Sequence, residues 1–230
     1  PQLFDGAVTP DGYAVNTVQP PFQPSGAIPD ATNPALADAG KNPLPPQTIK
    51  TIGDTLSAKG ISWKWYSGGW QQALADRGQI YAGAVNFQAH HQPFNYFNRF
   101  IPGSSDRLNF LKDEQDLLAD IRQGTLPSVV FYKPQGSLNE HPGYTDVLSG
   151  DQHIAELIRQ LQASPQWKNM AIIVTYDENG GFWDHVAPPK ADRWGPGSRI
   201  PAIMISPFAK RGYIDSTPYD TTSILQFLTK

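Results

Sequence analysis

The chain has 230 residues, of which 17% are charged, and its formal net charge is −3 at neutral pH. A slightly acidic chain lacks the basic surface that nucleic-acid backbones require, so no nucleic-acid partner is expected. No apolar run approaches the ~20 residues that span a bilayer, so no transmembrane segment is expected. The absence of cysteine excludes disulfides and thiolate metal sites. This length can bury one sizeable α/β core.

Residues 1–50 are rich in Pro, Gly, Asn and Ala and show no hydrophobic periodicity, which predicts an irregular arm. The apolar side chains that indicate packing of this arm on the rest of the chain are Tyr13, Val15, Val18 and Phe22. A freely extended arm is the alternative. We therefore divide the chain into an arm, residues 1–50, and an α/β domain, residues 51–230.

The domain begins with a predicted helix over residues 51–59, which ends at Gly60. A strand with period-two alternation follows over residues 61–66, and a second helix is predicted from about residue 69 to residue 76. This spacing is typical of a β–α unit in a parallel sheet.

Residues 106–123 have the periodicity of one amphipathic helix that ends before Gly124. Its apolar side is formed by Leu108, Leu111, Leu117, Leu118 and Ile121. Four acidic residues are expected to form a solvated face without a site: Asp113, Glu114, Asp116 and Asp120.

Three further strands are predicted over residues 126–133, 171–175 and 200–206, each a buried apolar run. Strands that alternate with helices through right-handed crossovers would form one parallel sheet. The fold class predicted from the sequence is therefore α/β, with a mostly parallel sheet flanked by helices.

Two more helices complete the pattern. Residues 151–161 form a predicted helix with Asp151 as its N-cap and His153 on its surface. Asp220 is expected to cap a final helix that runs to the end of the chain.

The run over residues 172–175 ends in two adjacent carboxylates, Asp177 and Glu178, followed by Gly180 and Gly181. In open α/β sheets, ligands bind outside the carboxyl ends of strands, and the glycine pair allows the chain to turn there. Carboxylate oxygens suit a divalent cation. The alternative is a charged loop after a buried strand.

Four of the five histidines follow predicted strands. Adjacent histidines in an aromatic loop could bind a metal or an anion, or could be hydrogen-bonded packing residues. The polar set beyond strand ends comprises His90, His91, Glu140, His141, Asp177, Glu178, Asp184 and His185. A cation with imidazoles is suited to phosphoryl or sulfuryl transfer. The sequence has no nucleophile elbow, Walker loop or dinucleotide-binding glycine pattern.

Four stretches resemble the bacterial phosphoesterase family, which joins acid phosphatases with non-haemolytic phospholipases C in the alkaline-phosphatase superfamily. They are residues 139–143, 175–189, 195–201 and 205–213. The likeness covers most of residues 50–230 and implies an alkaline-phosphatase-like fold. Residues 12–17 and 20–24 are similar to the acid-phosphatase branch.

The resemblance implies one divalent metal ion, held partly by Asp177 and Glu178. The phosphate-binding and catalytic histidines that it implies are His90, His91 and His141. The further candidates in the same loops are Glu140, Asp184 and His185. A periplasmic or secreted bacterial protein is also implied.

Family members carry a Glu-Asn metal-ligand pair and a Ser or Thr nucleophile upstream of the matched region. Neither is found in this chain. We therefore expect an α/β fold that is incomplete at its N-terminus, with a missing segment of the same polypeptide as a partner and little activity in this chain alone. An inactive remnant is the alternative.

Three functions remain open from the sequence. A phosphomonoesterase acting on a small phosphate ester is favoured by Thr221, where phospholipase-type members tend to carry His. A phospholipase C acting on a phospholipid would gain support from an aromatic cage for choline, but a core role is favoured for the same residues, because large aromatic side chains dominate protein cores. The aromatic residues in question are Trp63, Trp65, Tyr66 and Trp70. The third function is a non-catalytic cation-binding module.

Overall fold

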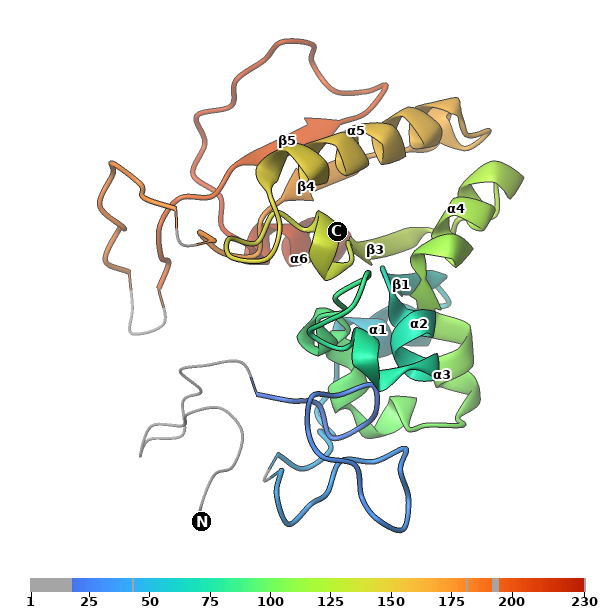
Figure 1. The fold of residues 1–230 in the computed structure, drawn as a ribbon. Helices are drawn as coiled ribbons and strands as arrows, with labels where there is room; N and C mark the ends of the chain where they lie inside the picture. Colours follow the sequence, from blue (N-terminus) through green and yellow to red (C-terminus); the bar gives the residue numbers. More distant parts are fainter. Residues whose placement is uncertain (1–17, 43, 181, 192–194, 230) are drawn as a thin grey trace. The chain divides into compact units, whose positions relative to one another are not determined.

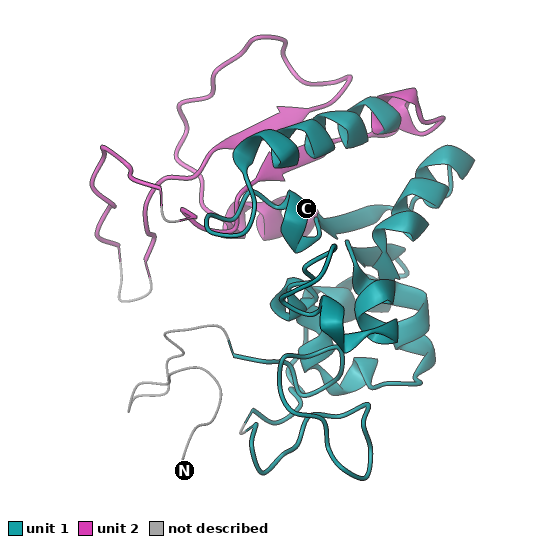
Figure 2. Cartoon of the chain, in the orientation of Figure 1, with its two compact units in different colours: residues 1–160 teal, residues 161–230 magenta. Residues whose placement is uncertain are grey.

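The computed structural model describes residues 18–42, 44–180, 182–191 and 195–229 (Figure 1). The chain forms two compact units, residues 1–160 and 161–230, each with its own sheet (Figure 2). Predictions that concern Tyr13, Val15, Gly181 and residues 12–17 lie outside the described residues.

The sheet of the first unit has three parallel strands. β1 (Trp63–Ser67) lies between β2 (Leu111–Asp113) and β3 (Val129–Lys133). Ser67 pairs with Asp113 on one side and with Lys133 on the other, so these three residues form a row at the carboxyl ends of the strands. The predicted α/β class, with a parallel sheet and flanking helices, is confirmed.

Helices α1 (Ile52–Ala58) and α3 (Ser105–Phe110) contact β1, and α2 (Trp70–Ala75) contacts β2 (Figure 1). α1 begins as predicted, because Thr51 and Asp54 exchange hydrogen bonds in a capping box that satisfies the first backbone N–H groups. The short 3₁₀ helices of the chain are η1 (Arg77–Gln79), η2 (Ala89–His91), η3 (Pro93–Tyr96), η4 (Asn98–Phe100), η5 (Gly136–Leu138) and η6 (Trp167–Asn169).

The predicted single helix over residues 106–123 is wrong. α3 ends at Phe110, β2 follows directly, and a separate helix, α4 (Glu114–Gln123), begins after it. Asp113 ends the strand and caps α4, since its carboxylate accepts a hydrogen bond from the Gln115 N–H at 3.0 Å. The leucine spacing continues across the break, but Leu108 is 65% exposed while Leu117 is 2% exposed. α4 ends at Gly124 as predicted, and this glycine has a positive φ.

The predicted solvated acidic face is also wrong. Asp113 is fully buried and accepts a second hydrogen bond, from the Gln71 N–H of α2. Asp120 accepts hydrogen bonds of 2.6 Å from both Lys64 and Tyr66 of β1. Asp113 therefore connects the start of α4 to α2, and Asp120 connects α4 to β1.

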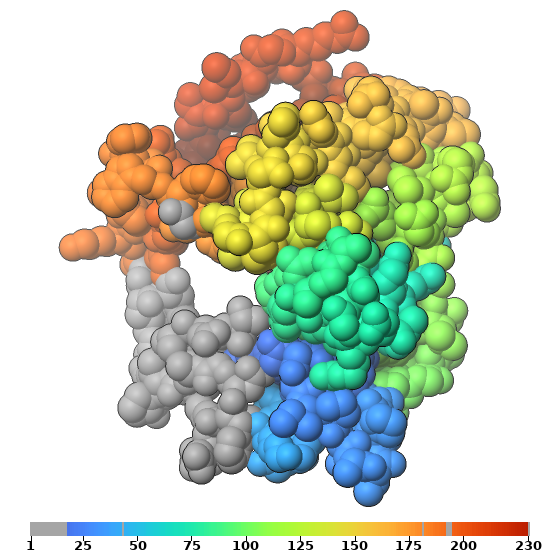
Figure 3. Space-filling model, viewed as in Figure 1, coloured from blue at the N-terminus to red at the C-terminus, as the bar shows by residue number. Residues whose placement is uncertain are grey.

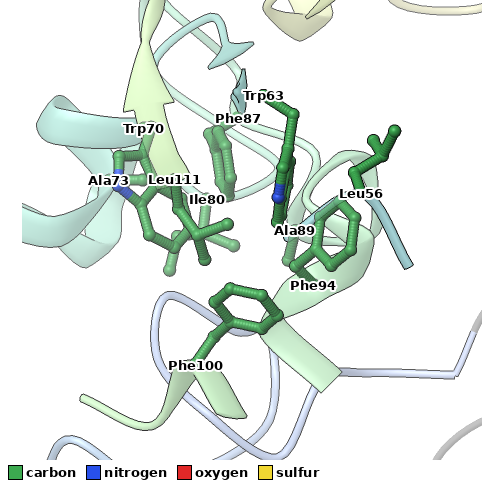
Figure 4. Packing of buried hydrophobic residues seen from close by; sticks show 10 residues of the cluster. All are labelled: Leu56, Trp63, Trp70, Ala73, Ile80, Phe87, Ala89, Phe94, Phe100 and Leu111. Atoms are coloured by element: carbon green, nitrogen blue, oxygen red, sulfur yellow. The ribbon is translucent and has the colours of Figure 1, made fainter. Parts of the chain in front are cut away.

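The core of the first unit is aromatic (Figure 4). Trp63 stacks on Phe110 at 4.5 Å between ring centroids and also packs against Phe94 and Phe100. Trp63, Tyr66 and Trp70 are buried, and Trp65 stacks on Phe131. These residues are therefore core residues, which is the role that the sequence favoured over a choline cage.

The described part of the arm packs on the first unit through its backbone carbonyl groups. Asn95 donates hydrogen bonds to the carbonyls of Phe22 and Pro24, and buried Arg107 donates to the carbonyl of Gln23. Burial lowers the pKa of Arg107 to about 10, so its guanidinium remains charged at neutral pH. The prediction that the arm packs is confirmed for these residues.

Helix α5 (Val147–Ala163) begins four residues earlier than predicted. Asp146 accepts a hydrogen bond from the Ser149 N–H at 2.8 Å, so Asp151 is not the N-cap. His153 does not lie on the surface: its Nε2 is 2.6 Å from the Tyr132 hydroxyl of β3 and 3.7 Å from a Glu114 carboxylate oxygen.

In the second unit, β4 (Ile172–Thr175) pairs with β5 (Ala202–Ile205), and α6 (Thr222–Thr229) follows. The two strands are antiparallel, so the prediction of one parallel sheet is wrong for this pair. The predicted burial of the last strand is wrong as well, because Ile203 and Met204 are about half exposed in a sheet of only two strands. Asp220 caps α6 as predicted, since it accepts a hydrogen bond from the Thr222 N–H.

Among the described residues, none of the helices has both the length and the apolar character needed to cross a membrane.

Candidate functional site

The first candidate loop, which contains His90 and His91, is fixed to the carboxyl end of β1. The backbone carbonyl of His91 accepts hydrogen bonds from the Ser67 hydroxyl at 3.1 Å and from the Trp65 indole at 2.9 Å. Gln92 donates to the same Ser67 hydroxyl. Both donors to the carbonyl lie on β1, so the position of η2 follows from the position of the strand end.

The two imidazole rings lie against each other, with centroids 4.5 Å apart and planes at 78°. His91 is only 7% exposed, whereas His90 is half-buried. His90 also stacks on Tyr81, whose hydroxyl lies 3.4 Å from His90 Nδ1. His90 is therefore the better placed of the two to meet a ligand, and His91 supports its ring.

The loop after β3 lies beside the segment that precedes η2. A Cβ placed on Gly136 would overlap the backbone carbonyl of Asn86, so only glycine permits this approach. The Ser137 N–H donates to the carbonyl of Val85. Two loops that carry predicted site residues are thus brought to the same edge of the sheet.

Glu140 and His141 occupy this loop in a constrained conformation. Glu140 has a φ of +65°, and its side chain packs over Gly150 in the first turns of α5. The helix dipole favours a carboxylate at that end.

His141 stacks on Tyr144 with centroids 4.5 Å apart. Its Nδ1 lies 2.7 Å from the carbonyl oxygen of Pro142, which can only accept a hydrogen bond. Nδ1 therefore carries the proton, and in the neutral ring Nε2 holds a lone pair.

The acidic pair, Asp177 and Glu178, follows β4 and is exposed. One carboxylate oxygen of Glu178 accepts a hydrogen bond of 2.7 Å from the Gly180 N–H, which closes the turn. Gly180 has a φ of +62°, as the predicted turn requires. Exposed carboxylates at a strand end fit a divalent cation as part of its ligand set.

Metal binding remains a prediction. In the part of the chain that the structure describes, no group of three or more acidic or histidine side chains could hold a metal ion. Asp177 and Glu178 would therefore contribute only two ligands of a larger set.

Asp184 and His185 lie in the same unit but differ in environment. Arg199 donates to both carboxylate oxygens of Asp184, and the Val186 N–H donates to one of them. These hydrogen bonds hold the pKa of Asp184 well below its ordinary value. Asp184 thus joins two parts of a loop, while His185 is exposed.

The predicted constellation therefore divides between the two units. His90, His91, Glu140 and His141 belong to residues 1–160, and the acidic pair with Asp184 and His185 belongs to residues 161–230. Within the first unit, the histidine loops share one edge of the sheet.

The sequence as a whole matches one family. A sequence model of the Phosphoesterase family matches residues 3–230. The chain belongs to the Phosphoesterase family.

Curated relatives of this phosphoesterase chain are phospholipases C. Phospholipase C B of Mycobacterium tuberculosis is 30% identical over 87% of this chain and 42% of its own length. The non-hemolytic phospholipase C of Burkholderia pseudomallei is 28% identical, over 77% of this chain and 31% of its own length. Non-specific phospholipase C6 of Arabidopsis thaliana is 31% identical over 63% of this chain and 34% of its own length. The chain thus spans less than half the length of these relatives.

The structure adds residues to the phosphoesterase site that the sequence did not indicate. Tyr81 and Ser67 contact the histidine loop, although no motif marks either of them. Both residues lie beside aromatic residues and glycines in the sequence, but such neighbours are common in loops and do not indicate a site.

Proposed function

We propose that this chain carries the phosphate-binding part of a phosphoric ester hydrolase. The observation that carries the proposal is the position of His90 at the carboxyl edge of a parallel sheet, in a chain of the Phosphoesterase family. Ligands of open α/β folds bind at that edge.

In this proposal the histidines act on the phosphate group. His90, with its ring supported by Tyr81 and His91, meets a phosphate oxygen, and His141 meets the phosphate from the loop after β3. Donors held in place before the reaction stabilise the charge that develops on the oxygens, and one such donor is worth roughly 10²–10³ in rate.

Asp177 and Glu178 are the proposed protein ligands of a divalent metal ion. A bound ion would polarise the ester oxygen. The Ser or Thr nucleophile that the resemblance implies lies outside this chain in the proposal. Export to the periplasm or the medium is a further part of it.

A phospholipid is the first candidate substrate, because the curated relatives described above are named as phospholipases C. A small phosphomonoester is the second candidate, favoured by Thr221 where phospholipase-type members tend to carry His. Trp63 of β1 is buried and Trp65 stacks on Phe131, so both are used in packing and neither supports a choline site.

Hydrolysis assays test the proposal. Phosphatidylcholine vesicles and para-nitrophenyl phosphate would be given to this chain and to a version extended upstream with its native sequence. We expect turnover of one substrate by the extended version and at least a hundredfold loss in its His90→Ala variant. His153→Gln, which changes a histidine that packs between α5 and β3, serves as the control.

Each outcome separates the candidates. Cleavage of the lipid alone supports a phospholipase C, and cleavage of the aryl phosphate alone supports a phosphatase. If a cation stabilises the protein but neither substrate is turned over, the proposed enzyme is wrong and a non-catalytic cation-binding module is supported. Turnover by the short chain would contradict the upstream position of the nucleophile.

A further inference from the structure

Three segments of the first unit meet at close range beside the carboxyl ends of β1 and β3. The loop junction that they form comprises Gly68 after β1, Asn86 and Gln88 before η2, and Gly136 after β3. A Cβ on Gly68 would overlap the backbone nitrogen of Gln135, and a Cβ on Gly136 would overlap the carbonyl oxygen of Asn86. The overlapping atoms belong to the backbone, so no side-chain rotation could relieve either contact. In Figure 3 the blue-green segment that precedes η2 lies against the yellow segment that follows β3.

Asn86 has a backbone conformation that few residues adopt. Its φ is +48°, in the left-handed region that asparagine tolerates better than most residues. Such a conformation persists only where the surroundings hold it. The carbonyl oxygen of Asn86 lies against Gly136 in this conformation, and a different φ would turn it away.

The Gln88 side chain holds the turn at Asn86 closed. Its Nε2 donates to the Asn86 carbonyl oxygen at 3.0 Å and lies 3.1 Å from Asn86 Oδ1. Gln88 is only 5% exposed, so its amide is a buried donor that needs acceptors within the protein. A Cβ on Gly136 would also crowd this amide. Asn86 and Gln88 thus bind each other and pack together on the glycine of the other loop.

The loop junction leads directly into the turn that carries His90. Gln88 is the residue before η2, and its carbonyl accepts a hydrogen bond of 2.9 Å from the His91 N–H. Phe87, between Asn86 and Gln88, is 1% exposed in the aromatic core. The position of His90 therefore follows from the positions of the two junction residues.

Short hydrogen-bonded steps also connect the loop junction to His141. Ser137 follows Gly136, and its carbonyl accepts a hydrogen bond of 2.8 Å from the Thr145 hydroxyl. The His141 N–H donates to Asn139 Oδ1 at 3.0 Å, and the His141 carbonyl accepts from the Thr145 N–H. The loop junction therefore lies between the two histidine loops and is connected to each of them.

We propose that Asn86 and Gln88 are positioning residues, which fix His90 relative to His141 so that both can contact one phosphate group. This inference rests on the proposed function. A phosphate held by groups from two loops requires a constant distance between the loops, and a displacement of about 1 Å can cost ~10²-fold in rate. The loop junction keeps that distance constant, because backbone atoms make its closest contacts.

The first measurement is the distance between the two loops, by pulsed electron paramagnetic resonance. The chain has no cysteine, so spin labels can be attached at introduced cysteines alone. Ala84→Cys and Leu148→Cys place the labels at exposed positions, one shortly before Asn86 and one at the start of α5. We expect one narrow distance distribution in the chain that carries only these two changes.

Four further variants test the loop junction. Asn86→Val should broaden the distribution, because a β-branched residue is strained at a positive φ. Asn86→Gly should keep it narrow, since glycine adopts that φ freely and retains the carbonyl that Gln88 binds. Gln88→Met removes the donor, nearly keeps the size of the side chain and should broaden the distribution. Ile121→Val removes a buried methyl group of α4, outside both loops, and is the control that should leave it narrow.

The second measurement is the affinity of the same variants, without labels, for inorganic phosphate by calorimetry. Asn86→Val and Gln88→Met should weaken the affinity about tenfold, the equivalent of about one hydrogen bond. Asn86→Gly and Ile121→Val should stay within about twofold of the unchanged chain. Equal losses of affinity in Ile121→Val and Gln88→Met would show that the junction residues only stabilise the fold, which would overturn the inference.

The remaining outcomes separate this inference from the proposed function. Broadened distances in Asn86→Val and Gln88→Met support the loop junction even if the unchanged chain binds no phosphate, and in that case the proposed function fails. A distribution that stays narrow in both variants would overturn the inference. Broadened distances with an unchanged affinity for phosphate would overturn the positioning role. If Asn86→Val unfolds, Gln88→Met decides both questions.

Discussion

The Ser67 hydroxyl at the end of β1 donates a hydrogen bond of 3.1 Å to the backbone carbonyl of His91. The same hydroxyl accepts hydrogen bonds from the Trp65 indole and from the Gln92 side chain. Ser67 is 1% exposed, so water cannot replace these contacts. The buried Ser67 hydroxyl, together with the Trp65 indole, therefore joins the parallel sheet to the histidine loop.

Replacement of Ser67 by alanine should loosen the histidine loop. The Gln92 amide would lose its acceptor in a fully buried place, so we expect a stability loss of roughly 1–3 kcal/mol. Urea unfolding and phosphate titration measure the two effects. Ser128→Ala, at an exposed serine hydrogen-bonded to Ser62 at the other end of the sheet, is the control. Equal losses in both variants would contradict the specific role of Ser67.

Replacement of Gly150 by alanine should have opposite effects in two backgrounds. A Cβ at this position would overlap the Glu140 side chain, so the single variant is expected to lose about 1–3 kcal/mol. In a Glu140→Ala background the overlap disappears, and alanine is then favoured over glycine in a helix by about 1 kcal/mol. Urea unfolding of the four chains forms a double-mutant cycle. A loss in both backgrounds would contradict the packing of Glu140 on α5.

Local features of the fold could be predicted from the sequence. Thr51 and Asp54 form a capping box within four residues, and Gly124 ends α4 through its own backbone freedom. The turn after β4 was predictable for the same reason, since Gly180 needs no distant partner to adopt a positive φ. In each case the residues that determine the structure are neighbours in the chain.

The predictions that proved wrong concern features that depend on residues far away in the sequence. β2 exists because Leu111 and Asp113 pair with β1, about 45 residues upstream, and the leucine spacing around them is equally compatible with a helix. Asp120 is bound by Lys64 and Tyr66, which no pattern near α4 reveals. In the candidate site the histidines could be named from the sequence, but not Tyr81, whose role depends on the path of the loop.

Because α3 and α4 are separate helices, replacement of two leucines of the same spacing by alanine should reduce the stability of the fold by different amounts. Leu117→Ala removes a buried side chain and should lose about 2–5 kcal/mol. Leu108 is 65% exposed, so Leu108→Ala should change stability by less than about 0.5 kcal/mol. Thermal or urea unfolding compares them directly. Similar losses for both would support one continuous helix with a shared buried side.

Asp120 predicts a loss of stability in acid. Burial alone would raise the pKa of Asp120, but hydrogen bonds from Lys64, Tyr66 and Thr125 outweigh it and lower that pKa. A carboxyl with a lowered folded pKa stabilises the fold above its unfolded pKa of about 4. That contribution is lost as the pH falls through the folded pKa.

Urea unfolding between pH 2 and pH 7 tests this dependence. Asp120→Asn should be less stable at pH 7 by about 1–3 kcal/mol and should lose less stability in acid than the unchanged chain. Asp151→Asn, at an exposed carboxyl on α5, serves as the control. Acid profiles of equal slope in the Asp120 variant and the unchanged chain would refute a role for this carboxylate.

Two groups of acidic residues in the second unit should differ in cation binding. Asp177 and Glu178 are exposed at the end of β4, and one oxygen of Glu178 accepts a hydrogen bond from the Gly180 N–H. Both oxygens of Asp184 are occupied by Arg199 and by the Val186 N–H.

Asp177→Asn should therefore weaken the binding of a divalent cation at least tenfold in calorimetry with Mg²⁺, Mn²⁺ and Zn²⁺. Asp184→Asn keeps the size of the side chain and should leave the affinity within about twofold while it loosens the loop, because a carboxylate engaged by a guanidinium offers few lone pairs to a metal. A larger loss of affinity in Asp184→Asn than in Asp177→Asn would move the cation site to the Arg199 loop.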